Sequence, residues 1–172
     1  MTVPDERKSL NIRRSFCRFF EEQFAIPNSM KGKVSYEDSA FDATDKETWL
    51  AVNFLSDMAG KKGTTLVQID VLTRYAGRRT GGDRYGTICQ QYADKVHAAL
   101  HVDAVPIYDF GTNPRAPALI AGKKLVIQNS GGIFREPDDV RAMEFEEGIN
   151  RIIFTYRIKV LGDYAKAPSY YD

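Results

Sequence analysis

The sequence predicts an α+β fold in which a mixed, mainly antiparallel sheet is covered on one face by an N-terminal helix and a central helix. Three observations predict it: a long alternating strand near the C-terminus, two apolar runs joined by a glycine-bearing loop, and two amphipathic segments with helical spacing. The expected order is helix, three strands, helix and three strands. Strands that follow one another without an intervening helix favour antiparallel pairing.

The alternating strand spans residues 148–161, GINRIIFTYRIKVL. Its apolar side chains fall on one side, while arginine, threonine and lysine fall on the other, with Ile153 as the single exception. The five apolar positions are Ile152, Phe154, Tyr156, Ile158 and Val160. Period two predicts a strand with one buried face and one solvated face, which requires a hydrophobic layer to cover it.

Two helices are expected to supply that layer. The first begins at Pro4, because proline is tolerated in a first helical turn and the acidic residues after it favour the helix dipole, and it ends before Pro27. The second spans residues 83–100, with Asp83 as its N-cap. Their apolar stripes are Leu10, Phe16, Phe19, Phe20 and Phe24 in the first helix, and Ile88, Tyr92, Val96 and Leu100 in the second.

The remaining strands are shorter. Residues 48–55 and 64–75 read as a long hairpin around the loop at 56–63. A proline-bearing loop is expected at 112–124. The other strands are expected at residues 34–37, 105–110 and 124–135.

Composition bounds the class of protein. The 172 residues suit one domain, which we assign to residues 1–163, with a flexible C-terminal arm at 164–172. Lys and Arg number 24 against 23 Asp and Glu, so the whole chain has no field that favours DNA or an anionic membrane. Neither a secretory signal nor a membrane-spanning segment is expected. Cys17 and Cys89 are expected to be reduced, structural thiols in a cytoplasmic setting.

No catalytic or metal motif stands out. Gly81, Gly82 and Asp83 before a helix could form an anion site, but their spacing matches neither a P-loop nor a dinucleotide fingerprint, so a mobile turn with solvated arginines is the expected reading. His97 and His101 lie four apart on a helix, but no glutamate stands beside His97 and the chain has no third histidine, so two surface histidines are expected. We therefore predict no catalytic residue, no metal and no cofactor.

The acidic cluster between residues 136 and 147 is expected to be a solvated loop, and a nuclease metal site is the alternative reading of it. It contains six acidic residues and one arginine, whereas residues 74–84 contain four arginines and one aspartate. Two segments of opposite charge can contact each other within one chain, or they can meet head to tail between copies and build a ring. Flexible loops and tyrosines add further contacts. The candidate assembly interface is Lys61, Lys62, Arg74, Arg78, Arg79, Arg84, Glu136, Asp138, Asp139, Glu144, Tyr170 and Tyr171.

The order of elements, together with one run of residues, resembles the tail terminator (tail completion) proteins of long-tailed bacteriophages and related contractile or tail-like particles. In that family a hairpin strand commonly has a Gln-hydrophobic-Asp-hydrophobic run, followed by a small-residue turn and a helix. Residues 68–77, QIDVLTRYAG, match this run, and GGDRYGTICQQYADKVHAAL follows it. The resemblance covers nearly the entire chain, and its motifs are loose.

The resemblance implies a structural virion protein and no enzyme. Such proteins assemble as a hexameric ring at the head-proximal end of the tail, after synthesis in the host cytoplasm. The ring caps the tail tube, ends polymerisation of the tube protein and offers a surface for joining the head-tail connector and neck proteins. Genomic DNA would pass through the ring without specific binding, and no membrane is involved.

Two departures leave other readings open. The polar stretch around residues 39–47 and the loop at 112–124 exceed what the minimal fold needs, and they would suit another neck or head-completion protein of the connector. A small metal-dependent nuclease that uses the acidic cluster and the arginine turn is the alternative from a different class. A simple DNA-binding module is disfavoured by the balanced charge.

Overall fold

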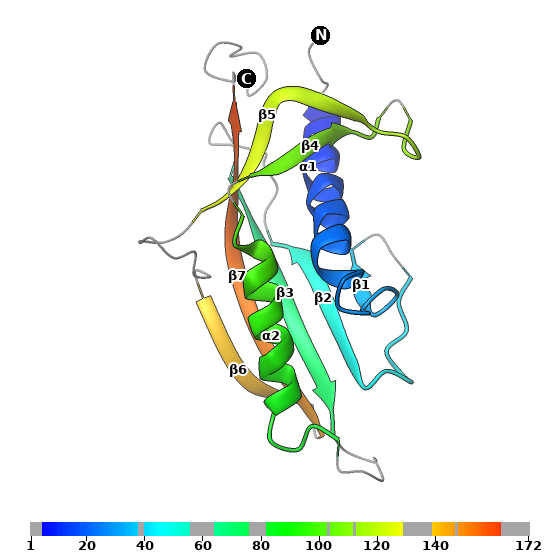
Figure 1. Cartoon of the computed structure of the whole chain (residues 1–172), viewed down its shortest axis with the longest axis vertical. Coiled ribbons are helices and arrows are strands. Elements are labelled where there is room, and N and C mark those ends of the chain that lie inside the picture. The colour runs from blue at the N-terminus through cyan, green and yellow to red at the C-terminus, as the bar shows by residue number, and fades with distance from the viewer. Residues whose placement is uncertain are drawn as a thin grey trace.

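The computed structural model describes residues 5–37, 40–55, 64–75, 82–102, 104–111, 113–128, 139–146 and 148–162. It confirms the α+β class, with two α-helices and a mixed, mostly antiparallel, curled sheet (Figure 1). Its elements are α1 (Asp5–Phe20), the π-helical turn η1 (Glu21–Ala25), β1 (Val34–Tyr36), β2 (Thr48–Phe54), β3 (Thr64–Arg74), α2 (Thr87–Leu100), β4 (Val105–Asp109), β5 (Ala118–Gln128), β6 (Asp139–Glu146) and β7 (Ile149–Gly162).

Strand β7 lies at the centre of the sheet. The strand order is β1-β2-β3-β7-β5-β4, and β6 also pairs with β7. One edge of β7 pairs with β3 from Ile149 to Lys159. Its other edge is divided, with β6 opposite residues 149–155 and β5 opposite residues 157–162. Only β1 and β2 run parallel among the described pairs.

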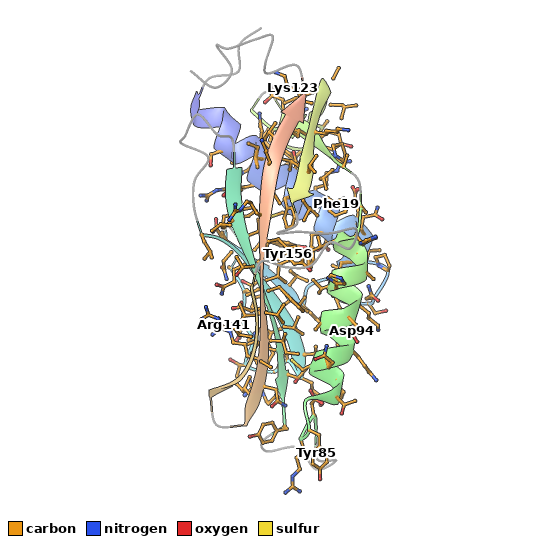
Figure 2. All side chains as sticks on the ribbon, turned by 90° about the vertical axis from the view of Figure 1, so that its left-hand side faces the viewer. Phe19, Tyr85, Asp94, Lys123, Arg141 and Tyr156 are labelled. Carbon is orange, nitrogen blue, oxygen red and sulfur yellow. The ribbon has the colours of Figure 1, made fainter. Side chains whose placement is uncertain are left out.

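Both helices cover the same face of this sheet, as expected. The alternate side chains of β7 from Ile152 to Val160 are buried, so the predicted period-two pattern is confirmed. They join one core with the inward side chains of the neighbouring strands and both helices (Figure 2). The helix side chains fully buried in this core are Phe16, Phe20 and Phe24 from the N-terminal segment and Cys89, Ala93 and Val96 from α2.

Helix α1 also closes the open edge of β4, a role that its apolar stripe does not reveal. Asn11 and Ser15 are fully buried polar residues on α1. The side-chain amide oxygen of Asn11 accepts the N–H of Phe110 at 2.9 Å, and the Ser15 hydroxyl accepts the N–H of Tyr108 at 2.9 Å. An edge strand with unpaired N–H groups can pair with other chains, and here helix side chains occupy two of those donors.

Three sequence predictions are corrected. Helix α2 begins at Thr87, four residues later than expected, because residues 82–85 form turns and Gly86 takes a left-handed conformation as the N-cap. Strand β5 begins at Ala118, inside the predicted loop at 112–124, since pairing with β4 and β7 stabilises this stretch. Much of the expected acidic loop is β6, because its ladder with β7 satisfies the backbone of residues 139–146 while the strand still carries charge.

No helix among the described residues is both long and apolar enough to cross a membrane.

Cys89 lies in the core, whereas Cys17 is half-buried on α1, and neither forms a disulfide bond in the described structure. The Cys89 thiol contacts the carbonyl oxygen of Val71 at 3.3 Å. Burial raises the pKa of this thiol from 9.0 to about 11. The thiolate is the reactive species, so burial suppresses reaction in two ways, through access and through ionisation.

We therefore expect a thiol reagent at pH 8 to leave Cys89 unmodified in the folded protein and to modify it after unfolding. The raised pKa alone lowers the thiolate fraction roughly a hundredfold at that pH. Mass spectrometry with and without denaturant measures this, and a Cys17→Ser variant isolates the Cys89 signal. Equal labelling rates for Cys89 in the folded and unfolded protein would contradict the prediction.

Candidate assembly surface

The structure describes the side chains of two of the twelve candidate interface residues, Arg74 and Arg84. Asp139 and Glu144 are placed along the backbone of β6, with side chains outside the described set. The other candidates lie outside the described residues: Lys61, Lys62, Arg78, Arg79, Glu136, Asp138, Tyr170 and Tyr171. The assembly role of the full set stays a prediction.

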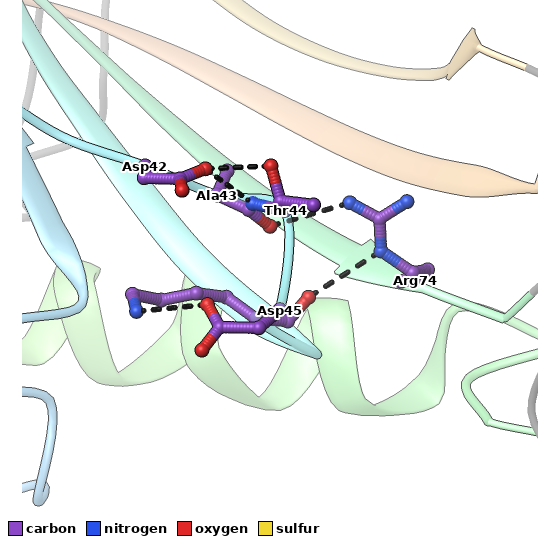
Figure 3. Close-up of polar contacts among 6 residues, drawn as sticks. Asp42, Ala43, Thr44, Asp45 and Arg74 are labelled. Atoms are coloured by element: carbon purple, nitrogen blue, oxygen red, sulfur yellow. Dashed lines mark hydrogen bonds and ion pairs between the residues drawn. The ribbon is translucent and has the colours of Figure 1, made fainter.

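Arg74 is engaged within its own chain on the sheet face opposite the helices. Its guanidinium lies 5.3 Å from the ring centroid of Trp49. The same group donates to the backbone carbonyl oxygens of Ala43 and Lys46, each at 3.4 Å (Figure 3). Trp49 belongs to a small second cluster with Leu72 and Ile149. Arg74 therefore ties the segment before β2 to this outer cluster and is less available to a partner.

The segment that receives Arg74 is shaped by a local turn. The Asp42 carboxylate accepts the N–H of Thr44 at 2.9 Å and its hydroxyl at 2.6 Å (Figure 3). Both hydrogen bonds lower the pKa of the Asp42 carboxyl, and the bond from the Thr44 hydroxyl has the larger effect. Such an Asx turn directs the chain back on itself. It leaves Phe41 and Ala43 packed against the outer cluster.

Arg84 and Tyr85 behave differently, because they project from a fixed turn. We call residues 82–86 the knuckle. Tyr85 is 88% exposed, and the Arg84 guanidinium lies 6.0 Å from its ring centroid. Figure 2 shows Tyr85 at one extreme of the molecule, beyond the first turn of α2.

Asp83 anchors the knuckle from within. This residue is only 4% exposed, and its carboxylate accepts the Thr73 hydroxyl at 2.5 Å and the N–H groups of Ile88 and Cys89 at 2.8 Å each. Asp83 therefore accepts the free N–H groups in the first turn of α2, which is the capping role predicted for it, although it lies three residues before the N-cap. The two N–H groups that an anion would use are already bound by this carboxylate, so the anion site suggested by the sequence gains no support.

The backbone on either side of Asp83 is equally restrained. Its carbonyl oxygen accepts the Asn150 side-chain amide at 2.6 Å and the Gly86 N–H at 3.1 Å. Gly82 has a φ of 51°, and a Cβ there would lie 2.7 Å from both the Arg74 carbonyl oxygen and the Tyr75 Cα. Only glycine fits this approach without displacement of the backbone.

The basic and acidic segments converge on the same end of the sheet. Arg74 pairs with Ile149, and Ile149 pairs with Glu146, so the end of β3 and the end of β6 flank the start of β7. Contact between the two segments within one copy is thus as compatible with the topology as contact across copies, which leaves both readings of the charge pattern open.

A charged network missed by the sequence reasoning lies on the outer face of β3 and β7. The Asp70 carboxylate is 2.6 Å from the Arg151 guanidinium, with side chains 7% and 19% exposed. Gln68 donates to the same carboxylate at 2.8 Å. Gln68 and Asp70 are the polar members of the Gln-hydrophobic-Asp run, so this motif has a structural role here. Their position on the same side of an alternating strand was the available signal.

The histidines do not form a metal pair in the described structure. His101 is exposed, but His97 is half-buried, and its Nδ1 lies 3.2 Å from the Tyr156 hydroxyl. Burial raises the pKa of Tyr156. The expectation of two surface histidines is therefore wrong for His97. Among the described residues no group of three or more histidine, cysteine or acidic side chains is placed to hold a metal ion.

Comparisons with known proteins support the fold alone. No family model matches the sequence, and no curated protein matches it. One solved structure, of a protein named only by an identifier that states no function, is 10% identical with a TM-score of 0.50. The similarity covers 87% of this chain and 95% of the other. The chain therefore shares an overall fold with that protein.

We expect Asp83→Ala to destabilise the protein by about 2–3 kcal/mol, because it removes a helix cap and leaves buried donors without an acceptor. Urea unfolding measures the free energy, and hydrogen exchange should accelerate at the Ile88 and Cys89 amides. The control is Asp94→Ala on the exposed face of the same helix, with an expected cost within about 0.5 kcal/mol. Equal effects of the two substitutions would refute the capping role.

Proposed function

We propose that this chain is a structural virion protein that forms a hexameric ring, caps a phage tail tube, ends tube polymerisation and provides a surface for head-tail joining. The observation that carries the proposal is the Gln68–Asp70 run on a central strand, followed through a turn by a helix on the same sheet. This combination is what gives the sequence its resemblance to tail terminators.

The described surface has two features that suit such a role. The knuckle presents Arg84 and Tyr85 from a rigid support, and arginine and tyrosine are frequent anchors of protein interfaces. The edge of β4 is closed by α1, so uncontrolled strand pairing is restricted there. A ring that must stop at a fixed number of subunits needs specific contacts and protected edges.

The competing candidate function is that of another neck or head-completion protein of the connector. The polar stretch before β2, which first suggested it, packs Phe41 and Ala43 against Trp49 on the outer face. This stretch is thus an integrated part of the fold, and it gives the outer face a shape that a minimal terminator would lack. Both candidates predict assembly with other virion proteins, but only the terminator should cap the tube.

Light scattering over a range of protein and salt concentrations tests the proposal. We expect a species of six times the 19.4 kDa chain mass, alone or with tube protein, and shorter tubes when the chain is added during tube polymerisation. A monomer in every condition with no effect on tube length would refute the ring-forming terminator. That outcome would direct attention to the neck protein and to a magnesium-dependent nuclease assay.

Charge reversal tests whether the basic and acidic segments join neighbouring subunits. Arg78→Glu with Arg79→Glu should weaken assembly, and Asp138→Lys with Asp139→Lys in the same chain should partly restore it, because the opposite charges would again face each other. The matched control is Arg115→Glu on an exposed turn after β4. Unchanged assembly in the first variant would remove these charges from the contact.

A further inference from the structure

The knuckle carries an aromatic side chain that is largely exposed to solvent. Tyr85 is 88% exposed, more than any other large apolar side chain among the described residues that are exposed. The neighbouring Ile88 is 39% exposed and extends the apolar surface along α2. Since an exposed tyrosine ring gains little from water, its position on a fixed support points to a contact outside the chain.

The support of Tyr85 is rigid before any partner arrives. Asp83 is held by Thr73, by two helix N–H groups and by Asn150, and Gly82 packs directly against the end of β3. A side chain displayed from an ordered backbone loses less conformational entropy on binding than one displayed from a loop that must first order. The knuckle is therefore suited to act as a preorganised anchor.

The charge around the anchor selects the kind of surface that it would meet. Arg84 lies over the Tyr85 ring, the single acidic residue of the turn is buried, and the first turn of α2 has no acidic residue. The sequence just before the knuckle adds Arg78 and Arg79. The complementary surface should combine an apolar contact for the ring with nearby negative charge.

The chain itself contains such a surface on β6. Val140 is 53% exposed, and it is the one exposed large apolar side chain among the described residues that falls in the acidic segment 136–147. Arg141 and Ala142 are also exposed, and among the described strands β6 pairs only with β7. Strand β6 thus offers one apolar position within acidic sequence along an edge of the sheet.

We infer that Tyr85 and Arg84 of one copy dock on β6 of a second copy, with the tyrosine ring against Val140 and the positive charge of Arg84 attracted by the acidic composition of that segment. The contact is heterologous, because the knuckle and β6 are different surfaces of the same chain, and such contacts propagate into a ring when the rotation closes. This inference rests on the proposed ring and specifies which residues would hold it together.

Alanine substitution tests the anchor. Tyr85→Ala should raise the protein concentration at which half of the chains are assembled by at least about tenfold, because interface tyrosines commonly contribute that much. Tyr85→Phe should retain most of the assembly, since it keeps the ring. Leu119→Ala is the matched control, as Leu119 is 61% exposed on β5 and away from both surfaces. Circular dichroism confirms that each variant is folded.

Crosslinking tests the partner surface. In a Cys17→Ser background, one chain carries Thr87→Cys and another carries Ala142→Cys, exposed positions that lie two residues from Tyr85 and Val140 and leave that pair intact. A short bifunctional maleimide is added to each chain alone and to their mixture. We expect covalent dimers in the mixture and none from either chain alone, since the contact joins unlike surfaces. Dimers from the Thr87→Cys chain alone would indicate a two-fold contact and overturn the inference.

The outcomes separate this inference from the proposed function. If the unmodified chain forms the hexamer while Tyr85→Ala assembles as well as Leu119→Ala, the knuckle contact is refuted and the ring stands. Weakened assembly without a crosslink in the mixture refutes Val140 as the receiving site. A strict monomer under all conditions, including added tube protein, refutes both the ring and the contact within it.

Discussion

The pairing of β7 is the constraint on which the rest of the structure depends. This strand has fourteen residues, β3 along one edge, and both β6 and β5 along the other. Every alternate side chain from Ile152 to Val160 is buried on the same face. A strand with such an apolar face must be covered, so the positions of α1 and α2 follow from it. The division of its second edge gives that side of the sheet two edge strands, β6 and, beyond β5, β4.

Buried polar side chains then fix how the covering elements sit on this sheet. Asn11 and Ser15 orient α1 along the edge of β4, and Asp83 joins the start of α2 to β3 through Thr73. Asp70 with Arg151 ties β3 to β7 on the outer face. A buried polar group without a partner costs roughly 1–3 kcal/mol, so each of these contacts disfavours alternative placements of its element.

The sequence predicted the fold where side-chain periodicity and backbone structure agree. The alternation of β7 and the stripe of α1 are such cases, because burial on one face imposes the same period as the backbone. It failed where tertiary pairing overrides local composition. Proline and glycine between residues 112 and 124 suggested a loop, although pairing with β4 and β7 makes residues from Ala118 onward part of β5. Acidic residues hid β6, which its pairing with β7 stabilises. The start of α2 was misplaced because Asp83 caps the helix from a preceding turn.

The candidate interface residues show that charge and exposure are separate properties of a side chain. In the sequence, Arg74 and Arg84 are equivalent members of one basic segment. In the structure, Arg74 is held over Trp49 and by two carbonyl oxygens, whereas Arg84 is exposed beside Tyr85. The difference arises because β3 continues through Arg74 and directs its side chain onto the outer cluster, while Asp83 turns the chain outward before Arg84. Position along a fold, rather than charge alone, decides which arginine can meet a partner.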